Sequence, residues 1–212
     1  MRRLLTLFSL LLSLCTSFAT TLTEEYHYRF EVVDVPFDHI AAQMDSIDYN
    51  QHLNERSLPL LLQLDSIMRL RPTPIKEARL TYWNVKCHQY TMTSDTAIIC
   101  LRRALSLVDS KSYDAARIGY QLAGNLQRNN RLAESWRLLE DTVMSIFRQK
   151  TDLLYLGNVY HLYSYIYRDI GDFAEAEHAL EEAKRHFQTG HFSMGKVYFA
   201  QALMEDHSNL SW

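Results

Sequence analysis

The side chains most able to bind a metal ion or support catalysis are the nine histidines. His178 and Glu182 are four residues apart, and His186 and His191 are five apart. The first spacing is typical of a solvated pair on one helix face, and Gly190 interrupts the second. The chain contains no His-Glu-x-x-His, no Cys-x-x-Cys and no Gly-x-Ser-x-Gly motif. We therefore expect no catalytic residue, no metal site and no cofactor, in a protein that is not an enzyme.

Two of the three cysteines, Cys87 and Cys100, flank a turn expected near residue 93, which places them almost opposite each other. An oxidising compartment could join them in a disulfide. Cysteine is also among the most buried residue types, and disulfide geometry is strict. Two buried thiols are therefore the favoured interpretation, and a disulfide is the alternative.

The first 19 residues have the three parts of a secretory signal peptide. Arg2 and Arg3 form a basic start, residues 4–14 are mostly apolar, and Ser17 and Ala19 are small residues at a cleavage site. We expect cleavage after Ala19 and export to the periplasm or the cell surface.

Neither a lipid anchor nor a membrane span is expected. Cys15 follows Leu14, whereas a lipidation site has a small residue before its cysteine, so a lipid anchor at Cys15 is disfavoured. The apolar run 4–14 is shorter than the roughly 20 residues of a transmembrane helix. No later segment is long and apolar enough either.

Composition favours a globular protein built from long helices. Apolar residues make up 47% of the 212 residues and charged residues 22%. With 22 Lys and Arg against 25 Asp and Glu, the net charge of −3 gives no basic surface for nucleic acid. Only 6 Gly and 4 Pro argue against a turn-rich β protein and against Gly-rich phosphate loops.

The chain changes its hydrophobic period at Pro36. Before it, Tyr26, Tyr28, Phe30 and Val32 alternate with polar residues, which predicts an extended arm over 20–36. After it the period is 3.6, which predicts an all-α domain over 37–212. The expected helices cover about 37–47, 55–70, 74–90, 94–108, 112–128, 131–148, 152–169, 172–188 and 191–206.

A packing pattern recurs at intervals of 38 and 41 residues. A small residue is followed four positions later by Leu and three later by a small residue or Thr, because small residues let two helices approach closely. The three copies are Ala97, Leu101 and Ala104; Ser135, Leu139 and Thr142; and Ala176, Leu180 and Ala183. Upstream, Gly119, Leu122, Ala123 and Leu126 match Tyr160, Tyr163, Ser164 and Tyr167.

These copies resemble the tetratricopeptide repeat (TPR) family. The clearest copy spans 157–190, a second spans 116–149, and a weaker one spans 77–110. The proline that ends each family repeat is missing, and the period exceeds the usual 34 or so. The resemblance implies a right-handed superhelical solenoid of antiparallel helix hairpins that binds a protein or a peptide.

In that family the first helix of each repeat lines a concave groove. The matching positions here combine tyrosine with cationic and amide groups, which suit protein recognition. Three arginines on one face would suit a peptide carboxylate or an acidic segment. The predicted groove residues are Arg117, Tyr120, Gln127, Arg128, Asn158, His161, Tyr165 and Arg168.

The expected helix 191–206 has apolar residues on more than one face, which suggests self-association or contact with another chain.

The sequence leaves three candidate functions. The first is an exported module that binds a protein or a peptide, for example as the sensor part of a bacterial regulator. The second is a free-standing scaffold for assembly at the cell surface or in the periplasm. The third, an enzyme on a helical-repeat fold, has no motif in its favour.

Overall fold

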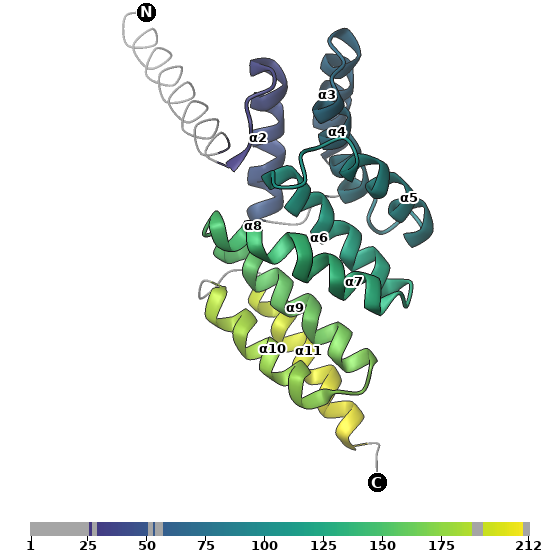
Figure 1. Cartoon of the computed structure of the whole chain (residues 1–212), viewed down its shortest axis with the longest axis vertical. Helices are drawn as coiled ribbons and strands as arrows, with labels where there is room; N and C mark the ends of the chain where they lie inside the picture. Colours follow the sequence, from purple (N-terminus) through teal and green to yellow (C-terminus); the bar gives the residue numbers. More distant parts are fainter. Residues whose placement is uncertain (1–25, 27–28, 51–52, 54–56, 188–192, 210–212) are drawn as a thin grey trace, which may run out of the picture.

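The computed structural model describes residues 26, 29–50, 53, 57–187 and 193–209. The predicted signal peptide, its cleavage site and Cys15 lie outside these residues. Every regular element within the described ranges is helical, and none is a strand, so the all-α fold class is confirmed (Figure 1). Within the same ranges, no helix has both the length and the apolar character needed to cross a bilayer.

The first five helices begin close to where the sequence predicts. They are α2 (Val35–Asn50), α3 (Leu58–Leu70), α4 (Pro74–Cys87), α5 (Ser94–Leu105) and α6 (Tyr113–Arg128). The hydroxyls of Thr73 and Ser112 cap α4 and α6 by accepting hydrogen bonds from backbone N–H groups of the first turn. Thr93, not the neighbouring Ser94, performs this function for α5.

The second half begins with a helix that is locally wider. The segment expected as one helix over 131–148 is divided into α7 (Leu132–Leu138), a π-helical turn η2 (Leu139–Val143) and α8 (Met144–Gln149). Gly119 of α6 packs here, since a Cβ atom on Gly119 would lie 2.9 Å from Cγ2 of Val143. The glycine, which lacks a Cβ atom, leaves room for the Val143 side chain. The remaining helices are α9 (Leu153–Asp169), α10 (Phe173–His186) and α11 (Ser193–Asn209).

The segment before α2 differs from the predicted extended arm. Tyr26 and Arg29 are helical, and the Phe30 N–H donates to the Tyr26 carbonyl oxygen at 2.9 Å. The rings of Tyr26 and Phe30 are buried and stack with centroids 4.3 Å apart. Residues four apart share a face in both a strand and a helix, so the alternating pattern could not distinguish the two.

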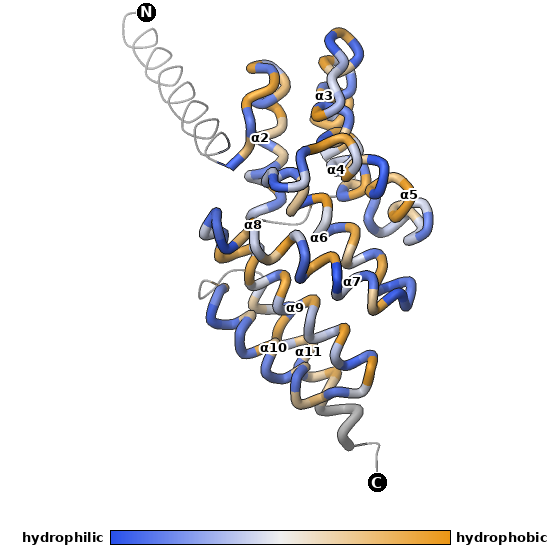
Figure 2. Tube along the Cα trace, in the orientation of Figure 1, coloured by the Kyte–Doolittle hydropathy of each residue, from blue (hydrophilic) through white to orange (hydrophobic). Residues whose placement is uncertain are grey.

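The helices follow one another along the long axis of the molecule, from α2 and α3 at one end to α10 and α11 at the other (Figure 1). Each helix contacts the next one along the chain. Contacts between helices that are not neighbours along the chain also occur: α6 contacts α4, η2, α8 and α9, and α9 contacts α7 and α11. Hydrophilic and hydrophobic stretches alternate along most helices, as expected of amphipathic elements (Figure 2).

The predicted small residues of the last copy occupy the interior. Ala176, Leu180 and Ala183 of α10 are fully buried and form a cluster with residues of α11. Tyr160 and Tyr167 of α9 pack against the same cluster. The small residues of this copy therefore lie where α10 packs against α9, as the recurring pattern predicts.

Candidate binding site

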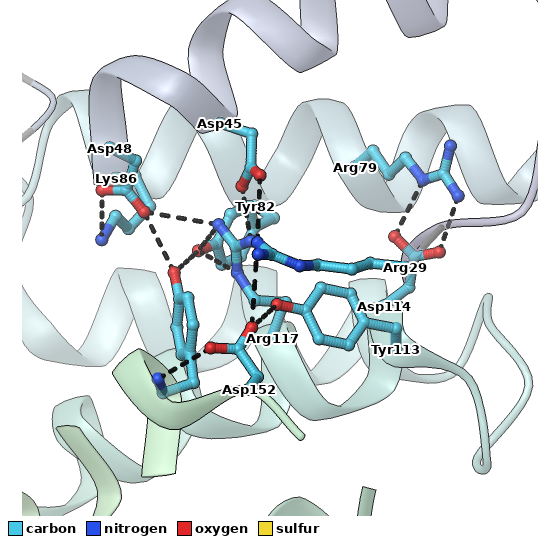
Figure 3. Close-up of polar contacts among 11 residues, drawn as sticks. Arg29, Asp45, Asp48, Arg79, Tyr82, Lys86, Tyr113, Asp114, Arg117 and Asp152 are labelled. Atoms are coloured by element: carbon cyan, nitrogen blue, oxygen red, sulfur yellow. Dashed lines mark hydrogen bonds and ion pairs between the residues drawn. The ribbon is translucent and has the colours of Figure 1, made fainter. Parts of the chain in front are cut away.

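A network of ion pairs and hydrogen bonds joins α2, α4, α6 and the start of α9 inside the protein (Figure 3). Arg117 of α6 lies at its centre, and only 2% of its surface is exposed. Its Nη1 pairs with Asp45 Oδ1 at 2.5 Å and its Nη2 with Asp48 Oδ2 at 3.3 Å. Its Nε donates to the hydroxyl of Tyr82 at 3.1 Å.

Aromatic rings surround the same guanidinium. Its carbon lies 4.4 Å from the centroid of Tyr155, 5.1 Å from Tyr82 and 5.6 Å from Phe30. These distances are within the range of cation–π attraction, which is strongest where water is excluded. Carboxylates and rings together offset the cost of burying the charge.

Arg117 was predicted for the groove, but the structure places it in this interior network. It does lie on the predicted face of α6. However, α2 and the segment at Phe30 cover this part of the helix. Asp45 and Asp48 of α2 pair with Arg117, and the centroid of the Phe30 ring lies 5.6 Å from its guanidinium carbon. Arg117 therefore holds helices together and does not face solvent.

A second ionic group fixes the segment before α2 to α4 and α6. Arg79 donates from Nε and Nη2 to the two oxygens of Asp114, each at 2.8 Å. Its Nη1 donates to Asp38 at 3.1 Å, and its Nη2 also donates to the Glu31 carbonyl oxygen at 2.9 Å. This fork geometry is the strongest that arginine forms with a carboxylate.

A cleft of about 460 Å³ lies beside the Arg117 network. Its walls come from α4, α6, α9 and α11, the helices that contact one another in turn, and α2 contributes Asp48. The cleft combines tyrosine rings with cationic and amide groups. Its lining residues are Asp48, Lys86, Gln89, Tyr120, Gln121, Gly124, Gln127, Arg128, Leu154, Tyr155, Asn158, His161, Leu162, Tyr165, Arg168 and Lys196.

Seven of the eight predicted groove residues line this cleft. On α9 they recur at intervals of three or four residues, and on α6 Tyr120 and Gln127 are seven residues apart with Arg128 next to Gln127, so each set lies on one side of its helix. Contact between α6 and α9 brings the two faces together. The seven are Tyr120, Gln127, Arg128, Asn158, His161, Tyr165 and Arg168.

The floor of the cleft is continuous with the buried network. Lys86 Nζ pairs with Asp48 Oδ1 at 2.8 Å, and the Tyr155 hydroxyl donates to Asp48 Oδ2 at 3.1 Å. Burial would raise the pKa of Asp48, but Lys86 and Arg117 together lower that pKa below its ordinary value. Burial likewise would lower the pKa of Lys86, but Asp48 raises it. Asp48 and Lys86 therefore remain ionised at neutral pH.

Lys196 of α11 closes one side of the cleft. Its Nζ lies 3.5 Å from Asn158 Oδ1, and its carbonyl oxygen accepts from His161 Nε2 at 3.3 Å. Burial, reinforced by the charge of Lys86, lowers the pKa of Lys196 to about 8. Burial and the charge of Lys196 lower the pKa of His161 to about 4. At neutral pH the imidazole is therefore neutral, and most Lys196 amines are charged.

The rim of the cleft carries a hydrogen bond between α6 and α9 and an ion pair within α9. Gln127 Nε2 donates to Asp169 Oδ2 at 2.7 Å, and Arg168 pairs with Asp169 Oδ1 at 2.6 Å. The Arg168 guanidinium also lies 4.7 Å from the centroid of the Tyr165 ring. Arg128 is exposed at the same rim. Cationic groups are thus presented both at the floor and at the opening.

Several lining residues were missed by the sequence analysis. Lys86, on α4, and Gln89, just after its end, could have been found, because the helix predicted over 74–90 places them three residues apart on one face. Lys196 had no local signal, since α11 reaches the cleft only by folding back against α9. Asp48 likewise depends on the packing of α2.

The other candidate chemistries are weakly supported. His178 and Glu182 form an exposed pair with 4.0 Å between Nε2 and Oε1. Among the described residues, no three or more His, Cys, Asp or Glu side chains gather as a metal site would require. Cys87 and Cys100 are separate thiols, and burial raises the pKa of Cys87 to about 11, which disfavours its reactive thiolate.

Comparison with known proteins gave no match to a family model, to a curated protein or to a solved structure. The geometry of the cleft is therefore the basis for assigning a function.

Proposed function

We propose that this chain is a non-catalytic, TPR-like helical-repeat module that binds a segment of a protein or a peptide in the cleft between α4, α6, α9 and α11. In this proposal the hairpins form a right-handed solenoid, and the cleft is its concave face. The observation that carries the proposal is the gathering of seven predicted groove residues, from two helices, around one opening.

The character of the lining supports a polypeptide ligand. Tyr120, Tyr155 and Tyr165 offer large rings that carry a hydroxyl, which suits partly wet interfaces. Gln121, Gln127 and Asn158 supply amides that can pair with a peptide backbone. The volume of about 460 Å³ accommodates a few side chains, so a short segment of a larger partner is sufficient.

We further propose that the protein is exported and acts in the periplasm or at the cell surface. The three-part pattern over 1–19 supports this proposal. N-terminal sequencing of protein recovered from its native host should begin at Thr20. An intact Met1 on the mature protein would contradict export by cleavage.

Site-directed photocrosslinking tests the location of binding. A photoreactive phenylalanine analogue at Gln127, inside the cleft, should form adducts with a polypeptide in the native host. The matched control is the analogue at Trp136, which is 41% exposed on α7 and lies outside the cleft. Adducts absent from position 127, or equal at the two positions, would contradict the proposal.

A second candidate function, a self-associating assembly scaffold, is favoured by α11. Val197, Ala200 and Met204 are buried against the rest of the protein, whereas Tyr198 and Phe199 are 58% and 61% exposed. Two neighbouring exposed aromatic residues are typical of a contact surface. Light scattering coupled to size-exclusion chromatography would show an oligomer that Tyr198→Glu dissociates. A monomer at all concentrations would remove this candidate.

A further inference from the structure

The cleft contains more positive than negative side chains. Among the described residues that line it, Lys86, Arg128, Arg168 and Lys196 are cationic and Asp48 is the sole carboxylate. A closed interior usually balances its charges, as the Arg117 network does with Asp45 and Asp48. The lining of the cleft is therefore complementary to a ligand that brings negative charge.

Asp48 is already committed to other partners. Its Oδ1 pairs with Lys86, and its Oδ2 accepts from Tyr155 and pairs with Arg117. The negative charge of Asp48 is therefore shared between Lys86 and Arg117, which are both buried. The low pKa of Lys196 agrees with this geometry, because burial and Lys86 disfavour its charged form more than Asp48 favours it.

We propose that the segment bound in the cleft presents an anionic group, a carboxylate or a phosphate, to Lys196 and Arg128, with Asn158 as a further hydrogen-bond donor. The Asn158 amide holds its oxygen toward Lys196 Nζ, which leaves its NH₂ group to donate. Tyr120 and Tyr165 form the walls beside this group. This inference rests on the proposed function and names the chemistry of the ligand.

The arrangement separates two roles among the cations. Arg168 is already paired with Asp169, and Lys86 with Asp48, so these two side chains are held in place by the protein. Arg128 lies at the open rim and Lys196 at the closed side. An anionic group beside Arg128 and Lys196 would gain a charge-assisted hydrogen bond from each, and the Lys86–Asp48 and Arg168–Asp169 pairs would stay intact.

The test uses fluorescein-labelled, C-terminally amidated hexaglutamate as a probe for carboxylate side chains, with fluorescence anisotropy on the chain from Thr20. Hexaglutamate should bind at 50 mM salt, bind more weakly at 200 mM salt, and bind at least tenfold more tightly than hexaglutamine. Hexaalanine with a free carboxyl terminus and a phosphoserine peptide distinguish a terminal carboxylate and a phosphate from a side-chain carboxylate.

Variants locate the anion. Lys196→Gln and Arg128→Gln should each weaken hexaglutamate binding about tenfold, the equivalent of one charge-assisted hydrogen bond. Lys111→Gln, an equal change of charge at an exposed site outside the cleft, is the matched control. Circular dichroism of each variant checks that its helices are retained.

Two outcomes would overturn the inference. One is that none of the three anionic probes binds better than hexaglutamine. The other is that Lys196→Gln and Arg128→Gln weaken binding no more than Lys111→Gln does. Polypeptide adducts at position 127 that persist in Lys196→Gln would leave the proposed function standing while this inference fails, so the two failures are distinguishable.

Discussion

The Arg117 network and the adjoining cleft are built from the same residue types but differ in how their charges are compensated. In the network, Arg117 meets two carboxylates, a tyrosine hydroxyl and several rings, and almost none of its surface is exposed. In the cleft, the described lining residues include four cations and one carboxylate, Asp48. A positive side chain on one helix face therefore holds the fold together where carboxylates cover it, and lines the cleft where they do not.

The largest expected effect follows from breaking the network. Arg117→Met should lower the free energy of unfolding by about 3–5 kcal/mol, because Asp45 and Asp48 would lose a buried counter-charge. Urea denaturation monitored by circular dichroism measures it. Arg128→Met, on the exposed rim, should change the same quantity by no more than about 0.5 kcal/mol. Equal losses of unfolding free energy in the two variants would show that Arg117 stabilises the fold no more than Arg128 does.

A smaller effect is expected from overpacking the hairpin that carries one wall of the cleft. Ala176 of α10 is fully buried, so Ala176→Leu should lower the free energy of unfolding by about 1–3 kcal/mol. Ala174→Leu makes the same change at an exposed position of α10 and serves as the control. An unchanged denaturation midpoint in Ala176→Leu would mean that α10 packs in another register.

The pH dependence of stability should reflect the ionisation of Asp48. Its pKa is lowered in the folded protein, despite burial, by Lys86 and Arg117. The unfolded chain then binds protons more readily, so this group stabilises the fold above its unfolded pKa of about 4, and the contribution is lost as the pH falls through the lower folded pKa. Urea midpoints between pH 6 and pH 2 should fall less steeply in Asp48→Asn. Identical slopes would contradict the ionised state of Asp48.

A small effect on stability is also expected at Arg168. Its pairing with Asp169 is partly exposed, so Arg168→Gln should change the free energy of unfolding by less than about 1 kcal/mol. The same variant should weaken binding of hexaglutamate, because a cation is removed from the rim. A loss of stability as large as that of Arg117→Met would place Arg168 with the structural residues.

Much of the helical fold could be predicted from the sequence because its signals are local. The period of 3.6 residues and the caps at Thr73 and Ser112 lie within a few residues of the helices they define. The π-helical turn at 139–143 could not be predicted, because it lies where Val143 packs on Gly119 of another helix, a contact that no local pattern indicates. The extended arm predicted at Tyr26 and Phe30 was wrong, because residues four apart share a face in both a strand and a helix.

The candidate site was predictable to the extent that one helix face defines it. The spacing on α6 and α9 identified seven lining residues. It could not show that α2 covers the first turns of α6, which removed Arg117 from the cleft. Nor could it show that α11 returns to place Lys196 beside Asn158. Contacts between helices distant in sequence decide which part of a face remains open.

The most direct test of the account is the number of protons taken up when hexaglutamate binds, measured by isothermal titration calorimetry in buffers of different ionisation enthalpy. The pKa of Lys196 is about 8, so close to half of its amines are neutral at pH 8. An anion placed beside Lys196 would raise that pKa, and the complex should take up as much as about half a proton at pH 8. The uptake should decrease below pH 7 and disappear in Lys196→Gln. Binding without proton uptake at pH 8, or uptake that persists in Lys196→Gln, would contradict the account.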